Sequence, residues 1–145
     1  MNSKELQRRT KKFALEIIKL ANHLPNNRVG WTFTDQIVRS CTSVAANYRA
    51  VCRAKSDKDF ISKMGTVIEE ADETLFWLEM IEETYLISDL GLRNVDLESI
   101  RNQKSKIINL KMEANELVSI FVASVKTVKN RLNQQSKISN QKTEQ

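Results

Sequence analysis

The scarcity of chain-breaking residues constrains the fold of this chain more than any other feature of its sequence. Its 145 residues include 3 glycines and 1 proline. Sheets and loop-rich folds use these residues at turns and bulges, so a chain with so few of them is expected to consist of long helices. The low aromatic share of 6% and the charged share of 28% are typical of helices whose outer faces lie in water. We therefore predict an all-α protein.

Apolar residues recur at intervals of three and four along four segments, which is the spacing of amphipathic helices. The expected helices run from Ser3 to about Leu24, from near Thr32 or Thr34 to about Lys55, from the cap Ser56 to about Ile81, and from about Asp96 to Leu132. Short connections between long helices favour antiparallel neighbours. The prediction is thus an antiparallel up-down-up-down four-helix bundle.

The last predicted helix has an apolar residue at every seventh position, which is typical of coiled-coil-like packing in a bundle. These residues are Ile100, Ile107, Ala114, Phe121 and Val128. From residue 133 onwards, Ile138 is the only apolar residue. We therefore expect a bundle domain over residues 1–132 and a disordered tail or frayed extension over residues 133–145.

The sequence offers few groups for catalysis or metal binding. Cys41 and Cys52 would lie on one helix about 16 Å apart along its axis, too far for a disulfide. With His23 as the sole histidine, neither a zinc site nor a di-iron site with Glu-x-x-His pairs is expected. We predict no catalytic residue, no metal and no cofactor, and hence a protein that is not an enzyme.

Two features bear on the location of the protein. Reduced cysteines are typical of the cytoplasm, which is the expected location. No apolar run approaches the length of a membrane span. The basic, amphipathic first helix could lie on a membrane surface, but its apolar side is also what a bundle helix requires. We favour the bundle and expect no membrane contact.

Charge is unevenly distributed along the chain, whose net charge is +5. The segment from Met64 to Leu92 contains eight acids and no base. Two interpretations remain open. In the first, the acidic helix neutralises its basic neighbours within one chain. In the second, it meets a basic flank of another copy, and a head-to-tail contact of that kind closes into a ring.

The second predicted helix carries a stripe of small and amide side chains beside its apolar face, and the third carries a second apolar strip. The stripe is either a polar layer satisfied within the chain or a contact between copies, since small residues let another helix approach closely. A helix that is apolar on two sides is usually buried on two sides. We predict a homo-oligomer, with interface residues Gln36, Ser40, Ser43, Asn47, Phe76, Trp77 and Met80.

Three stretches of the sequence resemble a known family: "FALEIIKLANHLP", "QIVRSCTSVAANYRAVCRAKSDKDFISKM" and "EEADETLFWLEMI". They are similar to the four-helix-bundle proteins associated with intervening sequences of bacterial 23S ribosomal RNA. The resemblance implies a homopentamer. It also implies kinship with the accessory proteins of diversity-generating retroelements, which are basic pentamers that bind nucleic acid and a reverse transcriptase. Ala50 departs from the pattern, since the family commonly has an acid there.

Clustered bases suggest a binding surface for phosphates, because arginine presents planar donors that match phosphate oxygens. They could instead pair with acids of the third helix or remain solvated. The predicted function is a non-enzymatic homo-oligomeric scaffold that binds RNA or DNA through its backbone. The alternative is a protein–protein interaction module with no nucleic-acid role. The candidate nucleic-acid-binding residues are Arg8, Arg9, Lys12, Arg39, Arg49, Arg53 and Lys55.

Overall fold

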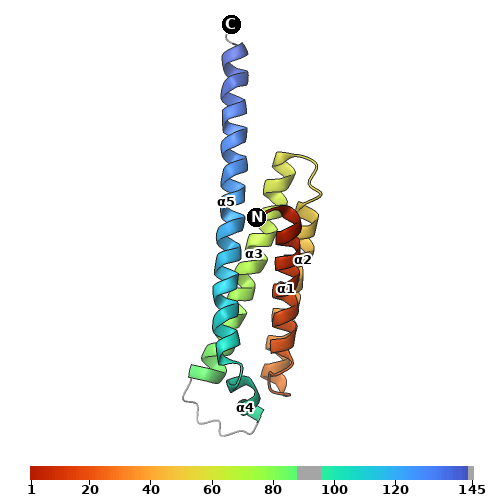
Figure 1. Cartoon of the computed structure of the whole chain (residues 1–145), viewed down its shortest axis with the longest axis vertical. Coiled ribbons are helices and arrows are strands. Elements are labelled where there is room, and N and C mark those ends of the chain that lie inside the picture. The colour runs from red at the N-terminus through yellow and green to blue at the C-terminus, as the bar shows by residue number, and fades with distance from the viewer. Residues whose placement is uncertain (88–95, 144–145) are drawn as a thin grey trace.

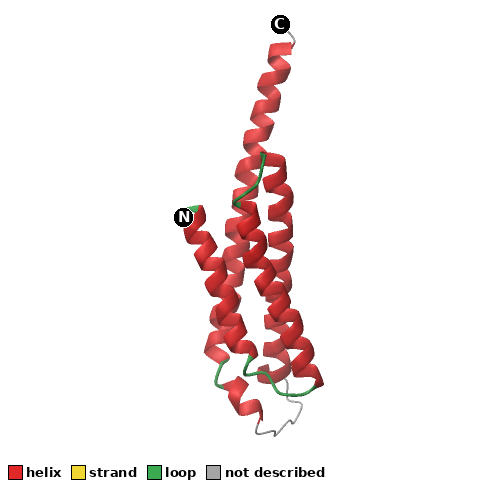
Figure 2. Cartoon of the chain, turned by 90° about the vertical axis from the view of Figure 1, so that its right-hand side faces the viewer, coloured by secondary structure: helices red, strands yellow, loops and turns green. Residues whose placement is uncertain are grey.

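The computed structural model describes residues 1–87 and 96–143, and within these residues the chain forms helices and no strand (Figure 2). This confirms the all-α fold predicted from the sequence. The elements are α1 (Ser3–Ala21), α2 (Arg28–Val51), α3 (Asp57–Glu82), the short π-helix η1 (Glu83–Ile87), α4 (Asp96–Arg101) and α5 (Lys104–Thr143).

Four long helices lie alongside one another, and the chain turns back between α1 and α2 and again between α2 and α3 (Figure 1). Helix α3 packs against both α2 and α5, and α2 also packs against α1, whereas α1 and α5 contact each other less. The start of α1 and the end of α2 are therefore neighbours. This arrangement places residues that are about forty positions apart in the sequence on one surface.

The buried core follows the predicted apolar stripes. Ile17, Ile37 and Val67 have no exposed surface, and Tyr48 stacks on Phe121 with a centroid distance of 5.7 Å. The seven-residue recurrence also proves to be core, since all its members are buried: Ile100, Ile107, Ala114, Phe121 and Val128. Packing of these stripes is the main source of stability, because burial contributes roughly 25 cal/mol for each Å² of apolar surface.

Helix α1 begins at Ser3 as predicted, and its N-cap is Asn2, whose side chain accepts a hydrogen bond from the backbone N–H of Glu5 at 2.9 Å. Helix α2 begins earlier than predicted. The N-cap of α2 is Asn27, whose side chain accepts from the N–H of Gly30 at 3.0 Å. The threonine expected at the start of α2, Thr32, lies inside the helix. In both cases an asparagine that reaches free N–H groups decides the boundary.

The other boundaries agree in part with the prediction. Ser56 caps α3 as expected and accepts from the N–H of Asp59 at 3.1 Å. The first two helices end a few residues sooner than predicted, at Ala21 and Val51. The segment expected to break the third helix begins as η1, and its later part, residues 88–95, lies outside the described residues.

The single last helix of the prediction is divided into α4 and α5 by a turn at residues 102–103. Helix α5 then continues to Thr143, so residues 133–143 are helical where a disordered tail or frayed extension was expected. All side chains from residue 133 to 142 are exposed, and this segment extends past the other helices (Figure 1). The domain boundary at residue 132 remains a prediction.

Two glycines provide a matched test of packing between the first loop and α2. A Cβ atom at Gly30 would lie 1.8 Å from the carbonyl oxygen of Pro25, whereas a Cβ at Gly65 in α3 would meet nothing within 4 Å. We expect Gly30→Ala to lower the free energy of unfolding by about 1–3 kcal/mol through overpacking. Gly65→Ala should raise it by roughly 0.5–1 kcal/mol through helix propensity. Chemical denaturation measures both, and equal effects of the two substitutions would contradict the close contact.

Candidate nucleic-acid interface

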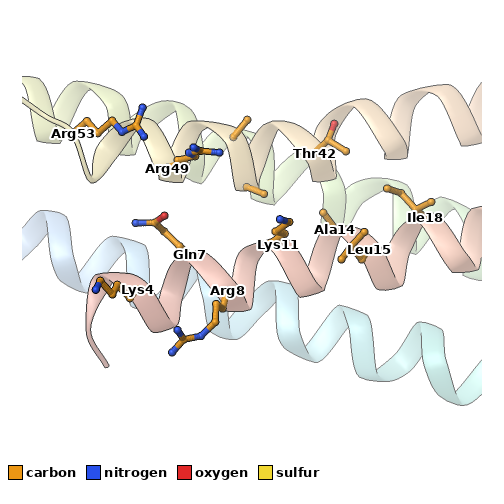
Figure 3. A pocket seen from close by; sticks show the side chains of 12 residues that line it. Lys4, Gln7, Arg8, Lys11, Ala14, Leu15, Ile18, Thr42, Arg49 and Arg53 are labelled. Atoms are coloured by element: carbon orange, nitrogen blue, oxygen red, sulfur yellow. The ribbon is translucent and has the colours of Figure 1, made fainter.

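An open groove of about 660 Å³ lies between α1 and α2, and five of the side chains that line it are cationic. Figure 3 shows its lining, with Gln7 and Lys11 of α1 directed towards α2 and Arg49 on the opposite wall. Arg8 points away from α2 and also lines the neighbouring hollow between α1 and α5. The five cations of this surface, called the basic groove below, are Lys4, Arg8, Lys11, Arg49 and Arg53.

The spacing of these residues explains why they converge. Lys4, Arg8 and Lys11 are four and three positions apart, so they share one side of α1. Arg49 and Arg53 are one helical turn apart at the end of α2. The reversal of the chain between α1 and α2 brings the two sets together. The interhelical contact thus creates a surface that neither helix has alone.

The cations of the basic groove are not neutralised within the part of the chain that the structure describes. Every ion pair found there involves other lysines and arginines, and these five side chains form none. Between the cations the groove is apolar, with buried Ala14 and with Leu15, whose side chain is 51% exposed. Uncompensated like charges beside apolar surface attract anions more strongly than isolated surface charges do.

Two of the predicted arginines lie elsewhere and are neutralised. Arg39 of α2 forms ion pairs with Glu73 and, at 3.7 Å, with Glu70 of α3. Arg9 of α1 pairs with Glu113 and, at 3.0 Å, with Glu116 of α5. Hydrogen bonding to Glu113 raises the pKa of Arg9. Neutralisation by the acidic third helix therefore describes Arg39, whereas Arg9 is neutralised by acids of α5.

The remaining predicted bases also lie outside the basic groove. Lys12 lines the hollow between α1 and α5, which Glu16 and Glu113 also line. Lys55 is exposed in the turn after α2. The sequence-based list omitted Lys4 and Lys11. Their spacing of four and three residues from Arg8 could have indicated that they belong to the same surface. However, α1 has basic residues on more than one side, and only the position of α2 decides which of them line the groove.

The polar stripe of α2 is largely satisfied inside the chain. Ser40 is fully buried, and its hydroxyl lies 2.9 Å from that of Thr74 on α3. The predicted role of Ser40 as an oligomer contact is therefore wrong, because the α2–α3 contact covers it. Asn47 donates to the Ser43 carbonyl at 2.8 Å and to its hydroxyl at 2.7 Å. Gln36 accepts a hydrogen bond from its neighbour, Arg39, at 3.4 Å.

The second apolar strip of α3 is only partly available to another molecule. Trp77 is half-buried and packs on Phe33 of α2, with ring centroids 5.8 Å apart. Met80 is half-buried against the core. Phe76, in contrast, is 48% exposed. It lies beside the exposed acid Asp72 on the outward side of the helix.

The described residues show no other arrangement that suggests chemistry. They contain no group of three or more His, Cys, Asp or Glu side chains that could hold a metal ion. Cys41 is buried, and this burial raises the pKa of its thiol to about 12, so it stays protonated at neutral pH. No helix among them is long and apolar enough to cross a membrane.

The buried hydroxyl pair is expected to stabilise the α2–α3 contact. Ser40→Ala and Thr74→Val should each lower the free energy of unfolding by about 1 kcal/mol, because each removes the buried hydrogen bond between the two helices. The double variant should lose less than the sum, because both single variants already lose this one shared hydrogen bond. Urea unfolding of the four proteins measures the coupling. Strict additivity would show that the two hydroxyls do not act together.

Comparison with known proteins agrees with the sequence patterns. No curated protein matches the chain. A solved structure from Bacteroides thetaiotaomicron, described as a protein with unknown function from the S23 ribosomal protein family, is 30% identical to it. The match covers 83% of this chain and 97% of that one, with a TM-score of 0.60. The model of the 23S rRNA-intervening sequence protein family matches residues 3–122. The chain therefore belongs to the 23S rRNA-intervening sequence protein family.

Proposed function

We propose that the protein is a non-enzymatic, homo-oligomeric scaffold that binds the phosphate backbone of RNA or DNA in the basic groove. In this proposal each subunit is an antiparallel up-down-up-down four-helix bundle. The observation that carries the proposal is that Lys4, Lys11, Arg49 and Arg53 line the groove between α1 and α2 with Arg8 at its edge, and that none of the five forms an ion pair with a described residue. The oligomer is proposed to be a pentamer, as the family resemblance implies.

The chemistry of the groove favours phosphates over other anions. Arg49 and Arg53 offer planar sets of N–H donors that match phosphate oxygens, and Lys4 and Lys11 add mobile point charges. The groove is open along its length, so it suits an extended polyanion better than a small enclosed ligand. It presents no aromatic side chain on which a base could stack. Binding of this kind is directed at the backbone and is nearly independent of base sequence.

The expected strength of binding follows from counterion release. Each neutralised phosphate contributes about 0.9 to the slope of log K against log salt on a duplex, and about 0.7 on a single strand. Five cations would therefore give a slope of up to roughly −4.5 per subunit on a duplex. Such contacts are weak one at a time. Repetition of the groove around an oligomer would raise the overall affinity through avidity.

The outward side of α3 supports the oligomer. Phe76 is 48% exposed, although aromatic side chains bury large areas when they find a partner. Exposed acids flank it along the helix, namely Glu69, Asp72, Glu79 and Glu83. An apolar centre with a charged rim is the usual composition of a protein interface. Trp77 and Met80 lie beneath this surface and hold it in place, so they belong to the proposed interface as supporting residues.

A second candidate function is a protein-interaction module with no nucleic-acid role. The apolar part of the groove favours it, since Leu15 and the half-buried Ile18 would suit the apolar side of an acidic helix. A reverse transcriptase is one such partner implied by family kinship. Retention of a defined protein but no RNA after nuclease treatment and a high-salt wash would support this alternative.

Neutralising the groove tests the first proposal. Arg49→Gln/Arg53→Gln should reduce the salt slope by about 1.4 on a single-stranded RNA, because two phosphate contacts are lost. Fluorescence anisotropy with a short labelled RNA over a range of salt measures the slope. Arg101→Gln/Lys104→Gln is the matched control, since it removes the same charge at the far end of the molecule (Figure 1). Equal slopes for the two variants would contradict binding in the groove.

Charge placed at Phe76 tests the oligomer. Phe76→Lys should convert the assembly to smaller species, because a buried, unpaired ammonium is costly to desolvate. Light scattering after size exclusion measures the subunit number. Val29→Lys, at an equally exposed position of α2, should leave it unchanged. A monomeric wild-type protein, or a Phe76→Lys variant with the wild-type subunit number, would rule out this interface.

A further inference from the structure

The C-terminal part of α5 is the most isolated helical segment of the molecule. Residues 133–143, called the arm below, continue α5 past the ends of the other helices (Figure 1). They cover about 16 Å along the helix axis. The arm projects from the end of the molecule at which α2 finishes and α3 begins. Arg49 and Arg53 of the basic groove lie at this same end.

The arm and the turns before it carry positive charge only. Between Leu117 and Thr143 the sequence has five bases and no acid. Arg131 pairs with Asp57 at 3.0 Å, whereas the four lysines form no ion pair with a described residue. These lysines are Lys126, Lys129, Lys137 and Lys142. A run of like charge on an exposed helix indicates a polyanionic partner.

Lysines and asparagines share one side of this helix. Lys126 and Lys137 are eleven residues apart, which is about three full turns, so they align along the axis. Asn133 lies between them, and Lys129 and Asn140 fall within roughly 60° of the same line. Val128, about 160° away from Lys126, is buried against the body of the protein. The lysine–asparagine face therefore points away from the other helices.

The composition of the arm argues against three kinds of partner. A second helix would need an apolar seam, but Ile138 is the only apolar side chain from residue 133 onwards. A membrane surface would need a wide apolar face, which is missing for the same reason. Single-stranded nucleic acid is bound mainly by stacking on aromatic residues, and the arm has none. A duplex, read through its grooves and phosphates, remains.

We propose that the arm inserts into the major groove of B-form DNA, with its lysine–asparagine face against the bases and phosphates. An α-helix is about 10–12 Å wide and the major groove is about 12 Å wide, so the exposed helix fits. Asparagine has the donor and acceptor that pair with adenine, and lysine donates to guanine or to phosphate. The major groove of A-form RNA is too deep and narrow for the arm. This inference rests on the proposed nucleic-acid function and narrows it to duplex DNA at this contact.

Two double variants test which face of the arm contacts the DNA. Asn133→Ala/Lys137→Gln should weaken binding to a short DNA duplex by at least about tenfold at low salt. Gln135→Ala/Lys142→Gln makes the same chemical changes on the opposite side and should weaken it by less than about threefold, because it costs only long-range attraction. The four positions are exposed, so circular dichroism and light scattering should match the wild type. Anisotropy with labelled DNA duplex, RNA duplex and single-stranded DNA measures the affinities.

The outcomes separate the arm from the basic groove. Loss confined to the DNA duplex, in the Asn133→Ala/Lys137→Gln variant alone, supports the inference. An equal loss of affinity in both arm variants, or an equal loss on RNA and DNA duplexes, overturns the inference about the arm but does not contradict the proposed function. If the arm variant loses duplex binding while Arg49→Gln/Arg53→Gln does not, the groove proposal fails and the arm stands. Absence of binding by the wild-type protein to any of the three probes overturns both.

Discussion

The apolar contact of α3 with α2 on one side and α5 on the other holds the structure together. Ala71, Leu78 and Ile81 have no exposed surface, so α3 lies in apolar surroundings along most of its length. Removal of this surface from water supplies the main driving force. This contact also sets the positions of the outer helices, because α5 packs on α3 and α1 packs on α2. The basic groove, the outward side of α3 and the arm all depend on this order of packing.

The same order of packing decides which arginines are neutralised. Arg39 faces α3, where Glu70 and Glu73 are within reach. Arg49 of the same helix and Arg53 in the turn after it line the groove beside α1, and α1 offers them more cations. Identical side chains therefore differ in charge compensation through their neighbours alone. An ion pair at the surface stabilises little, but a cation without one remains free to attract a ligand.

Buried polar groups fix the register of α2 against α3. The hydroxyls of Ser40 and Thr74 lie 2.9 Å apart across the two helices, and a shift by one residue would break this interhelical hydrogen bond. Glu70 adds to this layer, since burial raises the pKa of its carboxyl although Arg39 lies nearby. The cost of leaving such groups unpaired selects one alignment of the two helices, and with it the positions of the cations on the far side of α2.

The sequence by itself determined the helical fold, the buried stripes and the family, because helix periodicity and a scarcity of breakers are local properties of the chain. It also identified Arg8, Arg49 and Arg53 as candidate ligands for phosphate. It misplaced the start of α2, since the capping Asn27 competes there with the nearby threonines. Only the tertiary structure decided that Ser40 is buried, that Arg9 and Arg39 are paired and that Lys4 and Lys11 complete the groove. The charges in the sequence cannot by themselves show which acid lies within 4 Å of a given arginine, because that distance depends on which helix packs alongside the arginine.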